Sequence, residues 1–241
     1  MDIINRKRPA EPANCSVTDS QHREKSRRVE ESSTLDGNNN IRIKQKTTTT
    51  HKAFDSHFHL DRASILSKGS LQLAIEEYLE TDISPSPEIP VEITGGVLVY
   101  CDPDTFLNVF PDTTKWKIAV GLHLKAAPYF TQEQFELIRE KLCDDRIVGL
   151  GEIGLDRSCN AVTWVSQEKV FERLLGLANP NKPVIIHVRG ERKDKMSEDV
   201  YKRALEIVKS NYEPEQKIQL HSFHGGVKQV QEWRRNFPNT Y

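Results

Sequence analysis

Short apolar runs recur six times from residue 53 onward, and a longer stretch with helical spacing separates each run from the next. The runs show little alternation of polar and apolar residues, which is typical of strands that are buried on both faces. Strands that alternate with helices form βα units, so the pattern predicts an α/β fold with a parallel sheet covered on both faces. The predicted strands are 53–58, 96–101, 117–123, 146–153, 183–188 and 217–223.

Amphipathic segments between these runs carry apolar residues at the spacing of one helix face. The predicted helices are 71–79, 132–142, 167–178, 199–210 and 227–236. Thr131 and Ser166 stand where N-caps are expected, since a hydroxyl oxygen there can accept from a free N–H group of the first turn.

Composition excludes several classes of protein. The 241 residues include 34 Lys+Arg and 35 Asp+Glu, a net charge of −1, which excludes a polycation of the histone kind. No apolar run approaches the roughly 18 residues of a membrane span, and no secretory leader is recognisable. The four cysteines lack a CxxC spacing, which indicates a reducing compartment and argues against a thiolate metal site. We therefore expect an intracellular protein, with no membrane and no obligate protein partner.

Residues 1–52 differ from the rest of the chain. They hold 11 basic and 7 acidic residues, no aromatic residue, and runs of Asn and Thr. A segment with so little to bury cannot offset its ordering entropy, so the sequence predicts a disordered tail at 1–52 and one domain at 53–241. Basic clusters at 6–8 and 25–28 fit either a nuclear-import signal or solvated charge, which leaves cytoplasm and nucleus both open.

Six of the eight histidines lie at or just after the carboxyl end of a predicted strand, namely His57, His59, His123, His187, His221 and His224. In a parallel barrel these ends share one face, where active sites are built. Side chains two apart on a strand point the same way, so His57 and His59 can bind one borderline divalent ion while Phe58 packs outward. The pattern as a whole predicts a metal site.

Glu152 is a carboxylate in an otherwise apolar strand, within the sequence GLGEIGLD at 149–156. An unpaired charge there would be costly, and either a metal ion or a salt bridge to a Lys or Arg removes the cost. Asp156 fits a site residue or a plain turn residue. Taken one at a time, His187 and His221 suit a structural role as well as a ligand role.

Five motifs, taken in chain order, resemble the signatures of TatD-type metal-dependent deoxyribonucleases. They are HFHLD at 57–61, GLH at 121–123, GEIGLD at 151–156, PVIIHVR at 183–189 and HSFHG at 221–225. The resemblance implies an amidohydrolase-like TIM barrel with two divalent ions of Mg, Mn or Zn. By it, His57 and His59 bind one ion, His187 and His221 bind the other, and Glu152 bridges them as the central catalytic residue. His123, Asp156 and Arg189 then lie near the substrate phosphate.

The reaction implied is hydrolysis of DNA phosphodiester bonds, in which two ions polarise the phosphoryl group and activate water. Arg189 or Lys125 can add positive charge at the phosphate. After GLH the family usually continues Pro-His, whereas Leu124 and Lys125 follow here.

Two features depart from the family in ways that affect the predicted activity. The family's last acidic strand end, a metal ligand and proton acceptor, has no counterpart before Tyr241, which puts activity in doubt. The 188 residues from Phe54 onward compare with roughly 250 for an eight-unit barrel. We therefore expect about six of eight βα units, in a fragment or in a degenerate relative. A DNase is the first hypothesis. A catalytically impaired metal- or nucleic-acid-binding protein and a hydrolase of another bond, such as an amide or lactone, are the alternatives.

Overall fold

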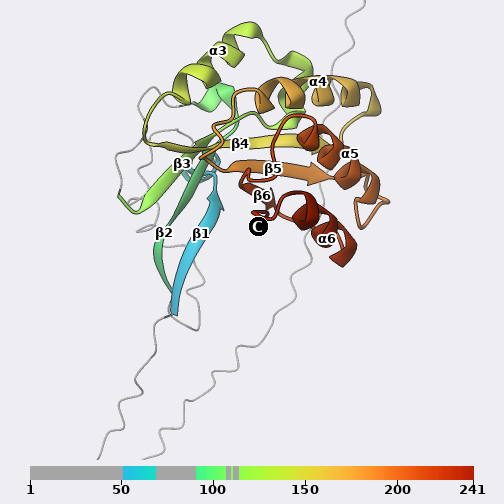
Figure 1. The fold of residues 1–241 in the computed structure, drawn as a ribbon. Helices are drawn as coiled ribbons and strands as arrows, with labels where there is room; N and C mark the ends of the chain where they lie inside the picture. The colour runs from blue at the N-terminus through green and yellow to red at the C-terminus, as the bar shows by residue number, and fades with distance from the viewer. Residues whose placement is uncertain (1–50, 69–90, 107–109, 111–113) are drawn as a thin grey trace, which may run out of the picture. The chain divides into compact units, whose positions relative to one another are not determined.

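The six predicted strands form in a computed structural model that describes residues 51–68, 91–106, 110 and 114–241. They pair in chain order as one sheet, and each strand is parallel to its neighbours (Figure 1). This confirms the α/β class read from the apolar runs. The strands are β1 His51–Phe58, β2 Val91–Tyr100, β3 Trp116–Val120, β4 Ile147–Asp156, β5 Val184–Arg189 and β6 Ile218–His221.

Five α-helices among the described residues follow strands. They are α1 Leu60–Lys68, α3 Gln132–Lys141, α4 Trp164–Leu175, α5 Glu198–Lys209 and α6 Val227–Asn236. The described residues also include the short 3-10 helices η1 Pro103–Thr105, η2 Leu124–Tyr129 and η3 Ala161–Thr163. α4 packs on β4 and α5 on β5, as the ribbon also shows. The helix predicted at 71–79 lies outside the described residues.

Of the two predicted N-caps, Thr131 is confirmed and Ser166 is wrong. Thr131 Oγ1 accepts from the backbone N–H of Gln134, whose side chain accepts from the N–H of Thr131 in return, a complete capping box. α4 already begins at Trp164, since η3 leads directly into it, so Ser166 lies inside the first turn.

The sheet separates two apolar layers because successive strand residues point to opposite faces. Leu98 and Tyr100 belong to the main core together with buried helix residues such as Phe171 and Trp233. Their neighbours on the strands form a small second cluster of Val99, Cys101, Ala119 and Ile185. The helices therefore cover one face of the sheet, and the small cluster lines the other.

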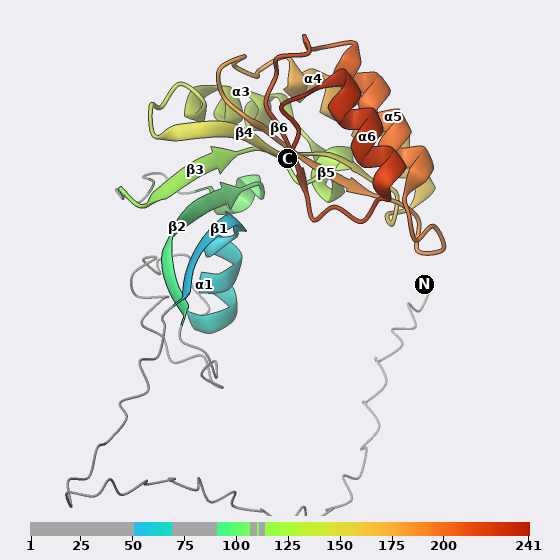
Figure 2. The ribbon, with the colours of Figure 1, turned by 60° about the horizontal axis from the view of Figure 1, so that its bottom comes forward.

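The six strands form a curled half-barrel, and its first and last strands approach each other on the inside of the curve (Figure 2). Gln219 Nε2 of β6 donates to the backbone oxygen of Ser56 on β1 at 3.4 Å. Beyond β6, the backbone of Asn239 and Tyr241 hydrogen bonds along the strand, with Ile218 N to Asn239 O at 3.0 Å and Leu220 N to Tyr241 O at 2.9 Å. None of the described helices is long and apolar enough to cross a membrane.

Candidate metal centre

The curl brings side chains from four strands to one place at the carboxyl ends. His57 is the penultimate residue of β1, and His59 directly follows that strand. Glu152 comes from β4, His187 from β5 and His221 from the end of β6. Glu152 and His187 are nearly fully buried, with exposed fractions of 2% and 3%. All five side chains that were predicted as metal ligands are therefore near neighbours.

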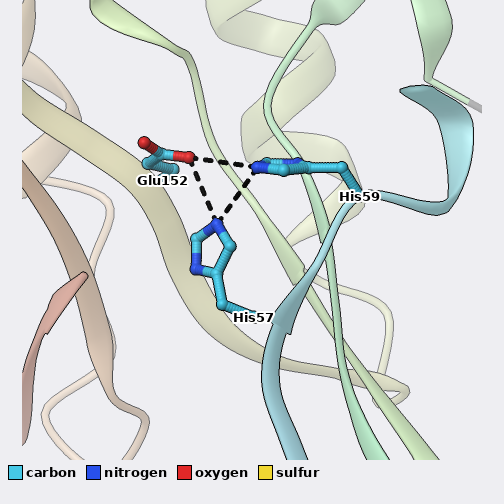
Figure 3. Close-up of side chains that lie close together, drawn as sticks. All are labelled: His57, His59 and Glu152. Atoms are coloured by element: carbon cyan, nitrogen blue, oxygen red, sulfur yellow. Dashed lines mark hydrogen bonds and ion pairs between the residues drawn. The ribbon is translucent and has the colours of Figure 1, made fainter. Parts of the chain in front are cut away.

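His57, His59 and Glu152 form a triangle of facing atoms (Figure 3). Glu152 Oε2 lies 3.3 Å from His57 Nε2 and 3.5 Å from His59 Nε2, and the two nitrogens are 3.2 Å apart. Tetrahedral ligands at the roughly 2.0–2.1 Å distance of a zinc–nitrogen bond stand about 3.4 Å from one another. The spacing of the three atoms fits ligands of one divalent ion.

The ring of His59 is held by a contact outside this triangle. Its Nδ1 lies 2.8 Å from the backbone oxygen of Val99 on β2. A carbonyl oxygen only accepts, so Nδ1 carries the proton and Nε2 presents a lone pair to the triangle. Metal-binding histidines are commonly oriented by such a contact of the second ring nitrogen.

A second group shares the same carboxylate. Glu152 Oε1 lies 2.6 Å from His187 Nδ1, and these atoms together with His221 stand close enough to hold an ion. The His221 ring stacks on that of His57 with centroids 3.5 Å apart. Glu152 thus directs one oxygen to each group.

Asp156 and His123 extend the cluster on its other side. Asp156 Oδ2 lies 3.4 Å from His187 Nε2, and Asp156 Oδ1 accepts from the backbone N–H of Ser158 at 2.9 Å. The His123 and His187 rings are 5.0 Å apart. His123, Asp156 and His187 are a third set whose atoms could hold an ion.

The electrostatics keep both carboxylates ionised. Burial by itself raises the pKa of Glu152, but its interactions with His187, His57 and His59 outweigh burial and bring the pKa far below its usual value. Burial likewise opposes ionisation of Asp156, and His187 and Ser158 together lower the pKa of that carboxyl. Two anionic side chains at the centre of a cluster of imidazoles suit a bound cation.

The pKa values of the buried histidines shift in opposite directions. Burial is the main reason that the pKa of His221 and that of His123 are both lowered to about 4, so these imidazoles are neutral at pH 7. Burial also disfavours the cation of His187, but Asp156 and Glu152 raise its pKa overall. Neutral imidazole is the form that binds metal.

Four buried polar atoms of the cluster have no aligned hydrogen-bond partner among the described residues: His57 Nδ1, His187 Nδ1, His187 Nε2 and Asp156 Oδ2. Buried polar groups in proteins are normally hydrogen-bonded. The two His187 nitrogens face carboxylate oxygens without hydrogen-bond alignment, so this set of residues fits a bound divalent ion.

The remaining predicted residue, Arg189, ends β5 and pairs in register with Asp156 on β4. Beside the cluster lie three residues that the sequence reasoning did not place there. Cys101 Sγ is 3.8 Å from Glu152 Oε2, and Arg62 makes a two-point ion pair with Asp102. Cys101 ends the predicted strand 96–101 and Asp102 follows it. This position at a strand end, which the histidines share, could have identified both residues as neighbours of the cluster. Burial raises the pKa of the Cys101 thiol.

The sheet is a parallel half-barrel covered by helices, an architecture of the α/β-barrel class. Histidines and carboxylates lie at the carboxyl ends of its strands, the face on which α/β-barrel proteins build their active sites. The model of the family "TatD related DNase" matches residues 54–237. The chain therefore belongs to the TatD family.

Curated proteins and solved structures resemble the chain. The human "3'-5' RNA nuclease TATDN2" is 33% identical over 192 residues, which cover 77% of this chain and 23% of that protein. The "Uncharacterized metal-dependent hydrolase YabD" of Bacillus subtilis is 34% identical over 77 residues, 32% of this chain and 30% of that protein.

The crystal structure of the TatD homolog YJJV from Escherichia coli aligns with a TM-score of 0.53 at 19% identity, over 76% of this chain and 64% of that one, and supports the fold. The chain thus spans less than a third of the two curated relatives and less than two thirds of the solved structure.

Proposed function

We propose that the chain is a metal-dependent nuclease that hydrolyses phosphodiester bonds, with DNA as its first candidate substrate. The observation that carries the proposal is the position of Glu152, one buried carboxylate that faces two histidine groups with its two oxygens. Membership of the TatD family supports the same reaction class.

In this proposal His57, His59 and Glu152 hold one divalent ion, and Glu152, His187 and His221 hold a second. Imidazole and carboxylate together suit Zn or Mn, and Mg remains a candidate. Bound ions supply positive charge to the phosphoryl oxygens and lower the pKa of water.

The other residues act on the phosphate through ordinary hydrogen bonds. His123 Nδ1 accepts from the backbone N–H of Lys125 at 3.3 Å, so the neutral ring carries its proton on Nε2. That N–H is then free to donate to a phosphate oxygen. Arg189 adds guanidinium charge at the end of β5, and the negative charge of Asp156, whose Oδ2 lies 3.4 Å from His187 Nε2, favours the cation of His187.

RNA is the second candidate substrate. The human relative is named a 3'-5' RNA nuclease, and its 192 aligned residues cover 77% of this chain. Both polymers present the same phosphodiester group to the cluster, so the site geometry favours neither.

The experiment follows decay of end-labelled single-stranded DNA and of RNA with the same sequence in Mg²⁺ or Mn²⁺. We expect metal-dependent decay that a chelator abolishes and that Glu152→Gln removes. Binding without cleavage by a folded, metal-loaded chain would favour the catalytically impaired alternative. Cleavage of a small amide or lactone, with both polymers intact, would favour the hydrolase of another bond.

A further inference from the structure

A cavity of about 360 Å³ lies beside the metal cluster, in the size range of small-ligand pockets. Its lining is Arg62 from α1, Asp102 after β2, and His123, Lys125 and Ala126 from the loop after β3. None of these residues belongs to the two groups that share Glu152.

Arg62 is fixed in place by its ion pair with Asp102. Its Nε lies 2.7 Å from Asp102 Oδ2 and its Nη2 lies 3.0 Å from Asp102 Oδ1. This pairing occupies one edge of the guanidinium, and Nη2 also donates to Cys101 Sγ at 3.4 Å. No partner for Nη1 is found among the residues that the structure describes. The arginine is therefore pre-oriented with donors left for a ligand, and 37% of its side chain is exposed.

The charge of the cavity favours an anion. Asp102 is the single carboxylate of the lining and is neutralised by Arg62, which leaves the ammonium of the exposed Lys125 as net positive charge. The N–H groups of Arg62 Nη1 can donate charge-assisted hydrogen bonds to phosphate oxygens.

His123 connects the cavity to the metal cluster. It lines the cavity, and its ring lies 5.0 Å from that of His187. Arg62 also interacts electrostatically with both Glu152 and His123. A strand whose scissile phosphate sits at the cluster can therefore place the next phosphate in the cavity.

We propose that the Arg62–Lys125 cavity binds the phosphate adjacent to the scissile one, which makes a nucleic acid strand with at least two phosphates the preferred substrate. The inference rests on the proposed function and extends it to substrate length. It gives Arg62 and Lys125 a role in binding the polymer.

The first test measures binding apart from turnover. Fluorescence anisotropy with a labelled single-stranded oligonucleotide, on chelator-treated protein in which turnover is stopped, should show a Kd about 10-fold higher for Arg62→Ala. The slope of log K against log salt should fall by about 0.7, the value for one lost phosphate contact on a single strand. Lys125→Ala removes an exposed side chain and should act in the same direction.

Arg146→Ala is the matched control. Arg146 makes a similar two-point pair with Asp144, with Nη2 to Oδ2 at 2.6 Å, but at the amino end of β4. Its removal should change neither Kd nor the salt slope. Equal effects of Arg62→Ala and Arg146→Ala in variants with native melting temperatures would overturn the assignment.

The second test uses bis(4-nitrophenyl) phosphate, which has one phosphate and cannot fill the cavity with another. With Glu152 intact, Arg62→Ala should raise KM for the oligonucleotide by a larger factor than KM for the small diester. An equal loss on both substrates would place Arg62 at the scissile phosphate and reject the cavity as a separate subsite. If neither substrate is hydrolysed the proposed nuclease fails, and the anisotropy measurement still decides the cavity.

Discussion

The two ends of the sheet differ in how their buried polar groups are hydrogen-bonded. At the amino ends, Lys182 Nζ donates to the backbone oxygen of Ile147 at 2.6 Å, and Gln216 Nε2 donates to that of Lys182 at 2.8 Å. At the carboxyl ends, both ring nitrogens of His187 are buried without an aligned hydrogen bond. These amino-end groups are hydrogen-bonded within the chain, whereas His187 at the carboxyl ends belongs to sets of residues that could hold a metal ion.

The largest expected effect is the response to metal. Adding Mn²⁺ to chelator-treated protein should raise the free energy of unfolding by about 2.7 kcal/mol when the free ion is 100 times its Kd, because the ion binds only the folded state. Glu152→Gln should remove most of this gain, since both groups lose their shared carboxylate. Thermal unfolding with and without Mn²⁺ measures it, and an equal shift in the variant would contradict the shared role.

His59→Ala should weaken metal binding by about 10- to 100-fold or more and leave the fold intact, because His59 lies at the edge of the core. Elemental analysis after dialysis gives the metal content. His224→Ala is the control, a neighbouring exposed histidine that belongs to none of the three metal-capable sets among the described residues. Unchanged metal in His59→Ala would remove His59 from the ligand set.

Gly154→Ala should destabilise the protein by about 2 kcal/mol and disturb the cluster through β5. Gly154 has φ of 143°, and a Cβ there would stand 2.0 Å from the backbone oxygen of His187. Urea denaturation measures the change. Gly176→Ala, at a helix end with φ of −62°, should stay within about 1 kcal/mol of the native protein. Similar values for the two variants would show that β4 and β5 adapt without strain.

The smallest expected effect on stability is that of a substitution at the amino end of the sheet, opposite the metal cluster. Arg146→Ala should lower the free energy of unfolding by about 1 kcal/mol. The pair with Asp144 is partly exposed and screened by solvent, and the hydrogen bond from Nη1 to the backbone oxygen of Phe110 at 3.0 Å is also lost. Metal content should not change. A loss of bound metal in this variant would mean that the two ends of the sheet are not independent.

Much of the fold was predictable because buried parallel strands are continuous apolar runs that stand out in the sequence. All six runs became strands with boundaries shifted by a few residues. α1 was missed, since its sequence was interpreted as part of the HxHLD motif rather than as a helix. The start of α4 was misplaced because a 3-10 turn leads into Trp164, and no side-chain N-cap marks the junction.

The proximity of the histidines followed from the rule that parallel strands share one carboxyl end. The sequence alone does not show which side chains of distant strands contact one another. The bond from His59 to Val99 depends on how β1 pairs with β2, and the pair of Arg62 with Asp102 joins residues 40 positions apart. Such contacts are properties of the assembled sheet.

The meeting of β1 with β6 has a consequence for folding. The contact of Gln219 with Ser56 spans 163 residues, and the stacking of His221 on His57 occurs at the same junction. Contacts of such high sequence separation form late, because the chain must order the intervening strands first. Pairing of β1 to β4 is sufficient to bring His57, His59 and Glu152 together, whereas the set with His221 also requires β6. The order of the strands along the chain therefore determines the order in which the two sets of candidate ligands are completed.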